Sequence, residues 1–237
     1  MIRLAIADSR ILSIRQVSTT FVGDGGLMNF STLIAISGAA LILGACSSGP
    51  PLDVPAGTYS LNFDSLPSAQ GWTFMQNGPA ENDVFSVDGT RLTQDTFGSG
   101  TSSFARYQID GVADSNKQMV LSLTARVLRH ENLTGGSTGL GFNFYVRDGA
   151  FAYRLALTDA LVQVGGEFYG LNTTDFHDYS FELYPGGNFD LYVNGVIFAT
   201  GIGSETVSSN GVFFGDSTTH ENTNAEITAM SFTVGTN

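Results

Sequence analysis

Residues 176–201 read FHDYSFELYPGGNFDLYVNGVIFATG, and this stretch decides the fold class. Apolar and polar side chains alternate over residues 179–184 and again over residues 189–194, which is the period of a strand with one buried face. The PGGN run at residues 185–188 breaks the first strand and reverses the chain. Asn194-Gly195 is a strong signal for a two-residue hairpin, because both residue types tolerate positive φ. We therefore predict three short antiparallel strands here.

The same stretch, followed by NGVFFGDST at residues 210–218, resembles the concanavalin A-like lectin/glucanase superfamily, and its laminin-G-like members in particular. The resemblance covers residues 59–234 and implies an all-β fold, an antiparallel jelly-roll β-sandwich. The superfamily holds lectins, glycosidases, lyases and adhesion modules. The resemblance therefore implies a fold and does not by itself imply a function.

The pattern continues over the rest of residues 58–237, which we predict to be a single sandwich domain. Residues 117–129 and 138–147 alternate in the same way, and Asp-Gly and Asn-Gly pairs recur between apolar runs. Roughly a dozen short strands with turn signals at regular spacing, and no convincing helix, are typical of an antiparallel sandwich.

The N-terminal part resembles a bacterial lipoprotein signal. Residues 30–43 are an apolar run too short to span a bilayer comfortably, and they end in the lipobox-like sequence LGAC at residues 43–46. We predict a signal peptide over residues 1–45, with translation starting either at Met1, with an extended arginine-containing n-region, or at Met28. An ordinary buried helix is the alternative, which the polar residues after Cys46 disfavour.

Cys46 is then the lipidated N-terminus of the mature chain, and residues 46–57 form a Pro/Gly/Ser-rich tether. Ser47, rather than an aspartate, follows the cysteine. By the same resemblance this favours the outer membrane of a bacterial cell envelope as the location of the lipid anchor.

The composition excludes some classes of function. The formal net charge is −12, and residues 1–45 hold three arginines and two aspartates, so the remainder carries −13. Such a chain repels phosphate backbones, so we expect no nucleic-acid partner. A single cysteine excludes a disulfide within the chain.

Sequence motifs for catalysis are lacking. The Glu-x-Asp-x-x-Glu strand of the superfamily's retaining glucanases is absent, and so is the Gln-x-His motif of its alginate-lyase-like members. His130, His177 and His220 have no His or Glu at zinc-site spacing. Trp72 is the only tryptophan, and we predict that it is a core residue rather than a sugar-stacking platform.

Calcium is the metal that the resemblance suggests, because laminin-G-like and pentraxin-like relatives often hold it at the sandwich edge. If the first and last strands pair, oxygen ligands from both are expected to meet there. The candidate ligands are Asp64, Asp216, Asn222, Asn224 and Glu226. The alternative is a solvated polar loop, which the absence of an Asp-x-Asp-x-Asp run favours.

A ligand-binding face is expected among the outward-facing residues of the central strands. Aromatic rings stack on sugars, and Arg, Asn and carboxylate groups bond to their hydroxyls. The candidate binding residues are Arg126, Asn143, Tyr145, Arg154, Glu182 and Tyr192. Two alternatives stay open. Arg126 and Arg154 can merely neutralise Glu182 and Asp190, or the site can lie on the rim loops at residues 132–137 and 216–224.

The sequence thus predicts a membrane-tethered, extracytoplasmic binding module for carbohydrate or another extracellular polymer. The alternative is a structural or adhesive lipoprotein without a glycan site, and the third hypothesis is a polysaccharide-degrading enzyme.

Overall fold

The computed structural model describes residues 54–98, 104–133, 141–205 and 209–236. The predicted signal peptide, Cys46 and most of the tether lie outside these ranges. Within them, no helix has the length and apolar character needed to cross a membrane.

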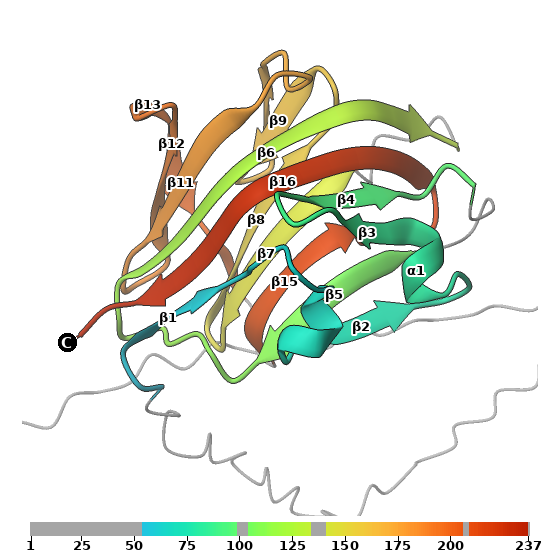
Figure 1. The fold of residues 1–237 in the computed structure, drawn as a ribbon. Helices are drawn as coiled ribbons and strands as arrows, with labels where there is room; N and C mark the ends of the chain where they lie inside the picture. The colour runs from blue at the N-terminus through green and yellow to red at the C-terminus, as the bar shows by residue number, and fades with distance from the viewer. Residues whose placement is uncertain (1–53, 99–103, 134–140, 206–208, 237) are drawn as a thin grey trace, which may run out of the picture. The chain divides into compact units, whose positions relative to one another are not determined.

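The described chain forms two antiparallel sheets that pack face to face (Figure 1). The first, called sheet A, has eight strands, and β1 pairs with β16 beside the main path. In spatial order the main path is β13 (Val196–Ile202), β12 (Asn188–Val193), β11 (His177–Leu183), β6 (Met119–Asn132), β16 (Glu221–Val234), β4 (Leu92–Asp95) and β3 (Phe85–Val87), with β1 spanning Gly57–Ser60.

The second, called sheet B, also has eight strands, and β14 pairs with β8 beside the main path. In spatial order the main path is β10 (Glu167–Gly170), β9 (Leu161–Val164), β8 (Phe151–Leu157), β7 (Phe142–Asp148), β15 (Asn210–Asp216), β5 (Ala105–Asp110) and β2 (Thr73–Gln76), with β14 spanning Ser204–Glu205.

The stretch at residues 176–201 folds as its sequence predicts, into the neighbouring strands β11, β12 and β13. Val193 pairs with Val196 across a two-residue turn. In that turn Asn194 has φ 51° and Gly195 has φ 75°. Both residues of the turn thus have positive φ, which matches the twist of the flanking strands.

The core lies between the sheets, and the alternation in the sequence identifies it. The inward residues of β6 are each at most 3% exposed, namely Met119, Leu121, Leu123, Ala125 and Val127. Aromatic rings of the two sheets pack against each other. The ring centres of Phe85 in sheet A and Tyr107 in sheet B lie 4.5 Å apart. Those of Phe181 in sheet A and Tyr153 in sheet B lie 6.4 Å apart. Burial of each such side chain stabilises the fold by roughly 1.5–3 kcal/mol.

Trp72 belongs to this core, as predicted. It is 6% exposed and meets Phe214 edge to face at a ring distance of 5.1 Å.

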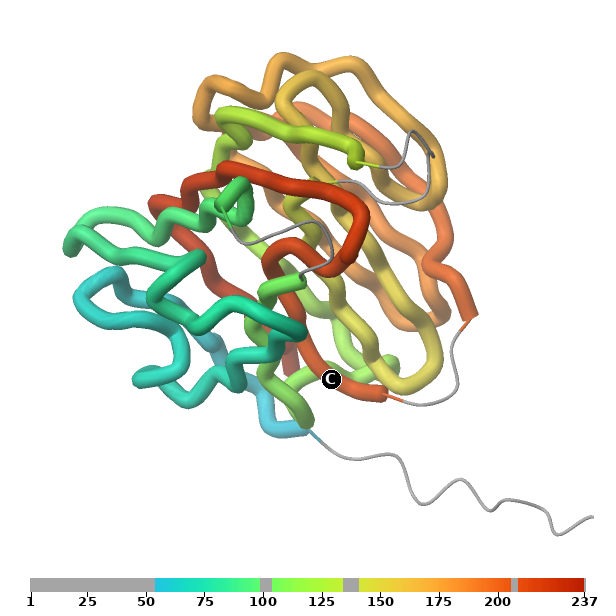
Figure 2. The backbone as a smooth tube through the Cα atoms, turned by 90° about the vertical axis from the view of Figure 1, so that its right-hand side faces the viewer, coloured from blue at the N-terminus to red at the C-terminus, as the bar shows by residue number. Residues whose placement is uncertain are grey.

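The structure differs from the sequence prediction at two places. A one-turn helix, α1 (Glu81–Val84), and a 3₁₀ turn, η1 (Pro67–Gln70), precede β3 and β2, where no helix is expected. The last strand, β16, begins at Glu221, inside the segment that we predicted to be a polar loop. Asn222 and Thr223 pair there with Glu131 and His130 of β6. Figures 1 and 2 show β6 and β16 running side by side.

Candidate functional site

The six predicted binding residues do not share one face, and this part of the prediction is wrong. Arg126 of β6, Glu182 of β11 and Tyr192 of β12 lie on sheet A. Asn143 and Tyr145 of β7, together with Arg154 of β8, lie on sheet B. Each set alternates with inward core residues, so the two sets point outward on opposite sides of the sandwich. Alternation shows on which side of its own strand a residue lies, but it does not show to which sheet the strand belongs.

On the outer face of sheet A, the arginine among the predicted residues has a carboxylate partner. The guanidinium of Arg126 donates to Glu226 at 2.8 Å, and Arg91 donates to the same carboxylate at 3.0 Å. Glu182 and Asp190 are direct cross-strand partners, and the hydroxyl of Tyr184 lies 2.8 Å from the first and 3.2 Å from the second. The alternative interpretation, in which Arg126 and Arg154 neutralise Glu182 and Asp190, is therefore wrong in its pairs, because Arg126 pairs with Glu226 and Arg154 lies on sheet B.

The outer face of sheet B brings the other three predicted residues together. Strand register sets Phe213 of β15, Tyr145 of β7 and Arg154 of β8 in one row across the sheet. On one side of this row lies Arg106 of β5, and on the other side lies Arg147 of β7.

Five of these side chains form a continuous series of cation–π contacts, which we call the arginine ladder: Arg106, Phe213, Arg147, Tyr145 and Arg154. The guanidinium carbons of Arg106 and Arg147 lie 5.3 Å and 5.0 Å from the centre of the Phe213 ring. Those of Arg147 and Arg154 lie 5.7 Å and 5.5 Å from the centre of the Tyr145 ring. Each contact holds a guanidinium in place at a gain of about 0.5–1 kcal/mol.

Hydrogen bonds fix two of the three guanidiniums further. Arg154 donates from Nε to Oδ1 of Asn143 at 2.7 Å, and the Asn143 amide in turn donates to the carbonyl of Gly141 at 2.8 Å. Arg147 donates to the hydroxyl of Ser209 at 3.0 Å. Asn143 is fully buried, so its role here is to position Arg154 rather than to meet a ligand.

Arg106 is the arginine of the ladder for which no side-chain hydrogen bond is seen among the described residues. Its Nε is buried and has no hydrogen-bond partner. Burial lowers the pKa of Arg106, and the nearby positive charge of Arg147 lowers it further. No described carboxylate ion-pairs with any of the three arginines of the ladder.

Two glycines on β15 lie beside the ladder, where the backbone of β5 approaches this strand closely. Gly211 and Gly215 flank Phe213 on the outward side, in register with Arg147 and Arg106 respectively. A Cβ at Gly211 would lie 2.5 Å from the carbonyl oxygen of Ile109, and one at Gly215 would lie 2.7 Å from that of Ala105. Only glycine therefore fits at both positions.

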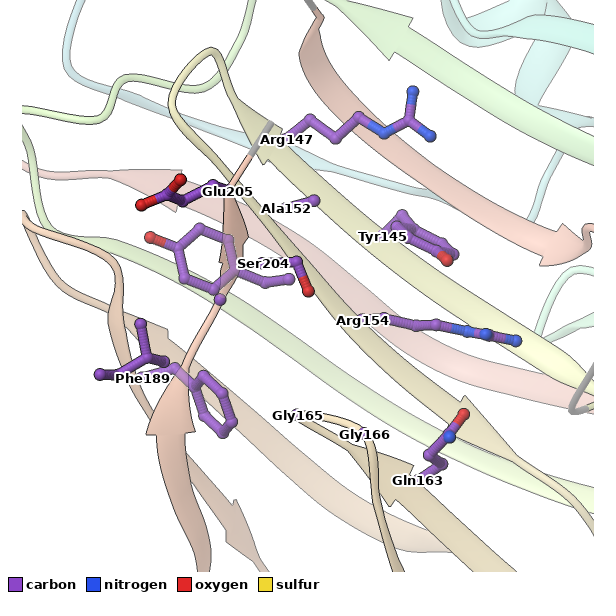
Figure 3. A pocket seen from close by; sticks show the side chains of 13 residues that line it. Tyr145, Arg147, Ala152, Arg154, Gln163, Gly165, Gly166, Phe189, Ser204 and Glu205 are labelled. Carbon is purple, nitrogen blue, oxygen red and sulfur yellow. The ribbon is translucent and has the colours of Figure 1, made fainter. Parts of the chain in front are cut away.

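A pocket of about 420 Å³ opens along one end of the ladder. Tyr145, Arg147 and Arg154 lie on one side of it, and Ser204 and Glu205 lie on the other (Figure 3). Its remaining lining residues are Ala152, Tyr153, Gln163, Gly165, Gly166, Phe189, Ile202 and Gly203. This volume suits a small molecule or one to two units of a polymer. Glu205 is the one carboxylate among the lining residues that the structure describes.

The five predicted calcium ligands are not gathered into one site. The first and last strands do pair, as that prediction requires, but Asp216 ends β15 in the other sheet. The carboxylate of Glu226 is engaged by two arginines, and the amide of Asn224 donates to Asp95 at 3.1 Å. Among the residues that the structure describes, no group of three or more His, Cys, Asp and Glu side chains is placed to hold a metal ion.

Asp216 instead belongs to a buried polar cluster. It is fully buried and accepts hydrogen bonds from the hydroxyl of Thr96 and the backbone N–H of Thr218, each at 3.1 Å. Burial raises the pKa of Asp216 to about 7, and the negative charge of Glu221 contributes in the same direction. Glu221 lies 3.3 Å from Nε2 of His130 and accepts a hydrogen bond from Gly141.

Sequence reasoning missed Arg106, Arg147 and Phe213. Arg147 falls on the outward side of a strand whose alternation is clear, and this pattern was sufficient to add it to the predicted binding residues. Phe213 lies in the apolar run VFF at residues 212–214, where no alternation marks it as outward-facing.

Two eight-stranded antiparallel sheets packed face to face define the fold as a concanavalin A-like jelly-roll sandwich. Solved structures share it. A sialidase superposes with a TM-score of 0.53 at 13% identity over 74% of this chain, and the match spans 18% of the sialidase chain. A carbohydrate esterase from the Shiga toxin-encoding bacteriophage phi24B superposes with a TM-score of 0.50 at 13% identity, over 76% of this chain and 100% of its own.

At these identities the likeness concerns the fold alone. No model of a known protein family matches the sequence, and no curated protein matches it.

Proposed function

We propose that this chain is a carbohydrate-binding module that acts outside the cytoplasm, and that its binding site is the outer face of sheet B. The observation that carries the proposal is the pocket bounded by Tyr145, Arg147 and Arg154. Aromatic rings, amide groups and fixed guanidiniums beside a groove are the combination that holds sugar rings and their hydroxyls. The carbohydrate esterase and the sialidase on the same fold agree with this class of ligand.

Binding is favoured over hydrolysis by the make-up of the pocket. Most glycoside hydrolases need two carboxyl groups on either side of the scissile bond. Among the described lining residues, Glu205 alone carries one.

The lipid anchor is part of the proposal. The lipobox-like LGAC sequence supports acylation of Cys46, and the residues after it form a tether long enough to hold the sandwich off a bacterial membrane. A module placed there meets extracellular polymers rather than cytoplasmic metabolites.

The test is binding of the full-length chain to a panel of soluble polysaccharides, with Tyr145→Ala and Tyr192→Ala as a matched pair. Both tyrosines are partly exposed, and each lies on the outer face of a different sheet. We expect Tyr145→Ala to weaken binding about tenfold or more with little change in melting temperature, because an anchoring aromatic side chain contributes over 1 kcal/mol. Tyr192→Ala should bind like the parent.

The reverse result would move the site to sheet A. Binding of the parent to no member of the panel would contradict the proposal and favour a structural or adhesive lipoprotein. Release of new reducing ends or of unsaturated sugars during incubation would favour an enzyme.

A further inference from the structure

The basic residues of the described chain divide into two groups. Arg91 and Arg126 ion-pair with Glu226, Arg129 lies 3.9 Å from Glu131, and Lys117 lies 3.6 Å from Asp114. The remaining three described basic residues, Arg106, Arg147 and Arg154, have no carboxylate partner among the residues that the structure describes. All three belong to the arginine ladder on one face of the sandwich.

From this grouping we infer that the ligand of the sheet B face is an anionic glycan, whose carboxylate or sulfate groups pair with the arginine ladder. The inference rests on the proposed carbohydrate-binding function and specifies its ligand class. A guanidinium presents parallel N–H donors that match the two oxygens of a carboxylate or sulfate. Holding three such groups together with no described carboxylate at ion-pair distance is unfavourable, and an anion bound across them reduces their mutual repulsion.

The geometry leaves the charged ends of the arginines available to a ligand. The aromatic rings and Asn143 hold the flat guanidiniums from the side of the sheet. Arg147 and Arg154 also line the pocket, where the hydroxyl of Ser204 and the amide of Gln163 can bond to sugar hydroxyls. The same surface thus offers cationic groups for the acidic substituent and neutral polar groups for the ring, while the Glu205 carboxylate lies on the other side of the pocket from the arginines.

A nucleic acid is the less favourable polyanion for this face. Non-specific binding of single strands depends on exposed aromatic platforms for the bases. Phe213 is 4% exposed, with the ladder guanidiniums over it, so Tyr145 is the one partly exposed ring of the ladder and successive bases would have no second ring of the ladder to stack on. The formal charge of −12 also repels a polymer with one charge per about 1.7 Å of helix axis. A polyuronate, by contrast, carries one negative charge per sugar ring.

The experiment uses the full-length chain and matched pairs of polymers. Polygalacturonate, polymannuronate and polyglucuronate are each compared with the carboxyl-reduced form of the same polymer, and dextran sulfate is compared with dextran. We expect at least one acidic member to bind tenfold or more tightly than its neutral counterpart. Its affinity should fall as salt is raised from about 0.05 M to about 0.5 M, because screening weakens exposed charge pairs. The uronate and sulfate arms distinguish the two sources of negative charge.

Variants assign the effect to the ladder. Arg147→Gln and Arg106→Gln should each weaken binding of the acidic polymer tenfold or more, since each removes a hydrogen-bonded ion pair. Arg147→Lys keeps the charge but loses the planar fork, and we expect an intermediate affinity. Arg126→Gln, at an arginine of sheet A that already pairs with Glu226, is the control and should bind like the parent. Circular dichroism confirms that each variant is folded.

The outcomes separate the inference from the proposed function. Equal binding of acidic and neutral forms would overturn the anionic ligand and leave carbohydrate binding in place. Selective binding of the acidic form that Arg147→Gln and Arg106→Gln leave unchanged would overturn the ladder as its site. Binding of none of these polymers would overturn the inference, and the wider neutral panel would then decide the proposed function. Tighter binding of single-stranded DNA than of any glycan would overturn both.

Discussion

Asp216 gives the fold a pH dependence whose sign and size follow from its surroundings. In the folded chain its pKa is about 7, mainly because the side chain is fully buried, whereas its ordinary value is 3.8. Between these values the native state holds a proton that the unfolded chain has lost. The free energy of unfolding therefore falls as pH rises through this window, and the destabilisation is fully present above pH 7.

The magnitude follows from the two pKa values. Each factor of ten in the ionisation constant corresponds to about 1.4 kcal/mol, so ionising Asp216 in the folded state costs up to about 4 kcal/mol. About 3 kcal/mol of this develops between pH 5 and pH 8.

Asp216→Asn removes the charge and can keep both hydrogen bonds. Its Oδ1 still accepts from the backbone of Thr218, and its amide can donate to the hydroxyl oxygen of Thr96. The hydroxyl hydrogen of Thr96 can then turn to the carbonyl of Thr223, 3.4 Å away. The variant should therefore gain about 3 kcal/mol relative to the parent between pH 5 and pH 8.

Urea unfolding at pH 5, 6, 7 and 8 measures this difference, followed by the fluorescence of Trp72 in the core. Glu167→Gln, at an exposed position on β10, controls for the loss of one negative charge. Parallel profiles of parent and Asp216→Asn would refute the reasoning, because they would mean that Asp216 ionises alike in the folded and unfolded chain.

Three further predictions concern the core, the anchor and the metal. Phe214→Ala, at a fully buried ring in contact with Trp72, should lower the free energy of unfolding by about 3–5 kcal/mol. Phe168→Ala, at a 48% exposed ring, should change it by under about 0.5 kcal/mol. Urea unfolding measures both values, and equal losses of stability would contradict the packing argument. Cys46→Ser should shift the protein from the membrane to the soluble fraction of bacterial cells, and unmodified Cys46 in the intact mass of the membrane-bound form would refute acylation. Millimolar calcium should leave the melting temperature unchanged, because the five predicted ligands are dispersed; a rise of several degrees that Asp216→Ala removed would restore the site.

Local patterns in the sequence were sufficient for the strands and the core. The alternation in β6 assigns five inward residues, and all five are buried. The Asn194-Gly195 pair forms the predicted turn, because positive φ at both residues is a local property of the chain.

The sequence did not predict the start of β16, because the residues there are polar. Glu221, Asn222 and Thr223 are each less than 9% exposed, although their side chains are typical of a loop. Their burial depends on pairing with β6, about 90 residues earlier in the chain. Such long-range pairing leaves no local period to detect.

The candidate site was predictable only in part, for the same reason. Asn143, Tyr145 and Arg154 meet because β7 and β8 form a hairpin joined by the Asp148-Gly149 turn, and sequence shows that. Arg106 reaches the ladder through β5 and β15, which lie about 100 residues apart in sequence. Arg126 was placed beside Arg154 because both point outward, although they belong to different sheets.

The acidic composition of the chain makes the absence of carboxylate partners at the arginine ladder evidence about its ligand. The sequence holds 22 acidic and 10 basic residues, of which two and three respectively lie in residues 1–45. The remaining 20 acidic residues outnumber the 7 basic ones almost threefold, so a shortage of carboxylates does not explain why Arg106, Arg147 and Arg154 have no carboxylate partner among the described residues. On sheet A one carboxylate, Glu226, serves two arginines. On sheet B the positions of β15 and β7 that pair directly with Arg106, Arg147 and Arg154 hold Gly215, Gly211 and Tyr145, none of which carries a carboxylate. Three described arginines without a carboxylate partner thus lie together on one face of an acidic chain, and the proposed anionic glycan would supply the missing counter-charge.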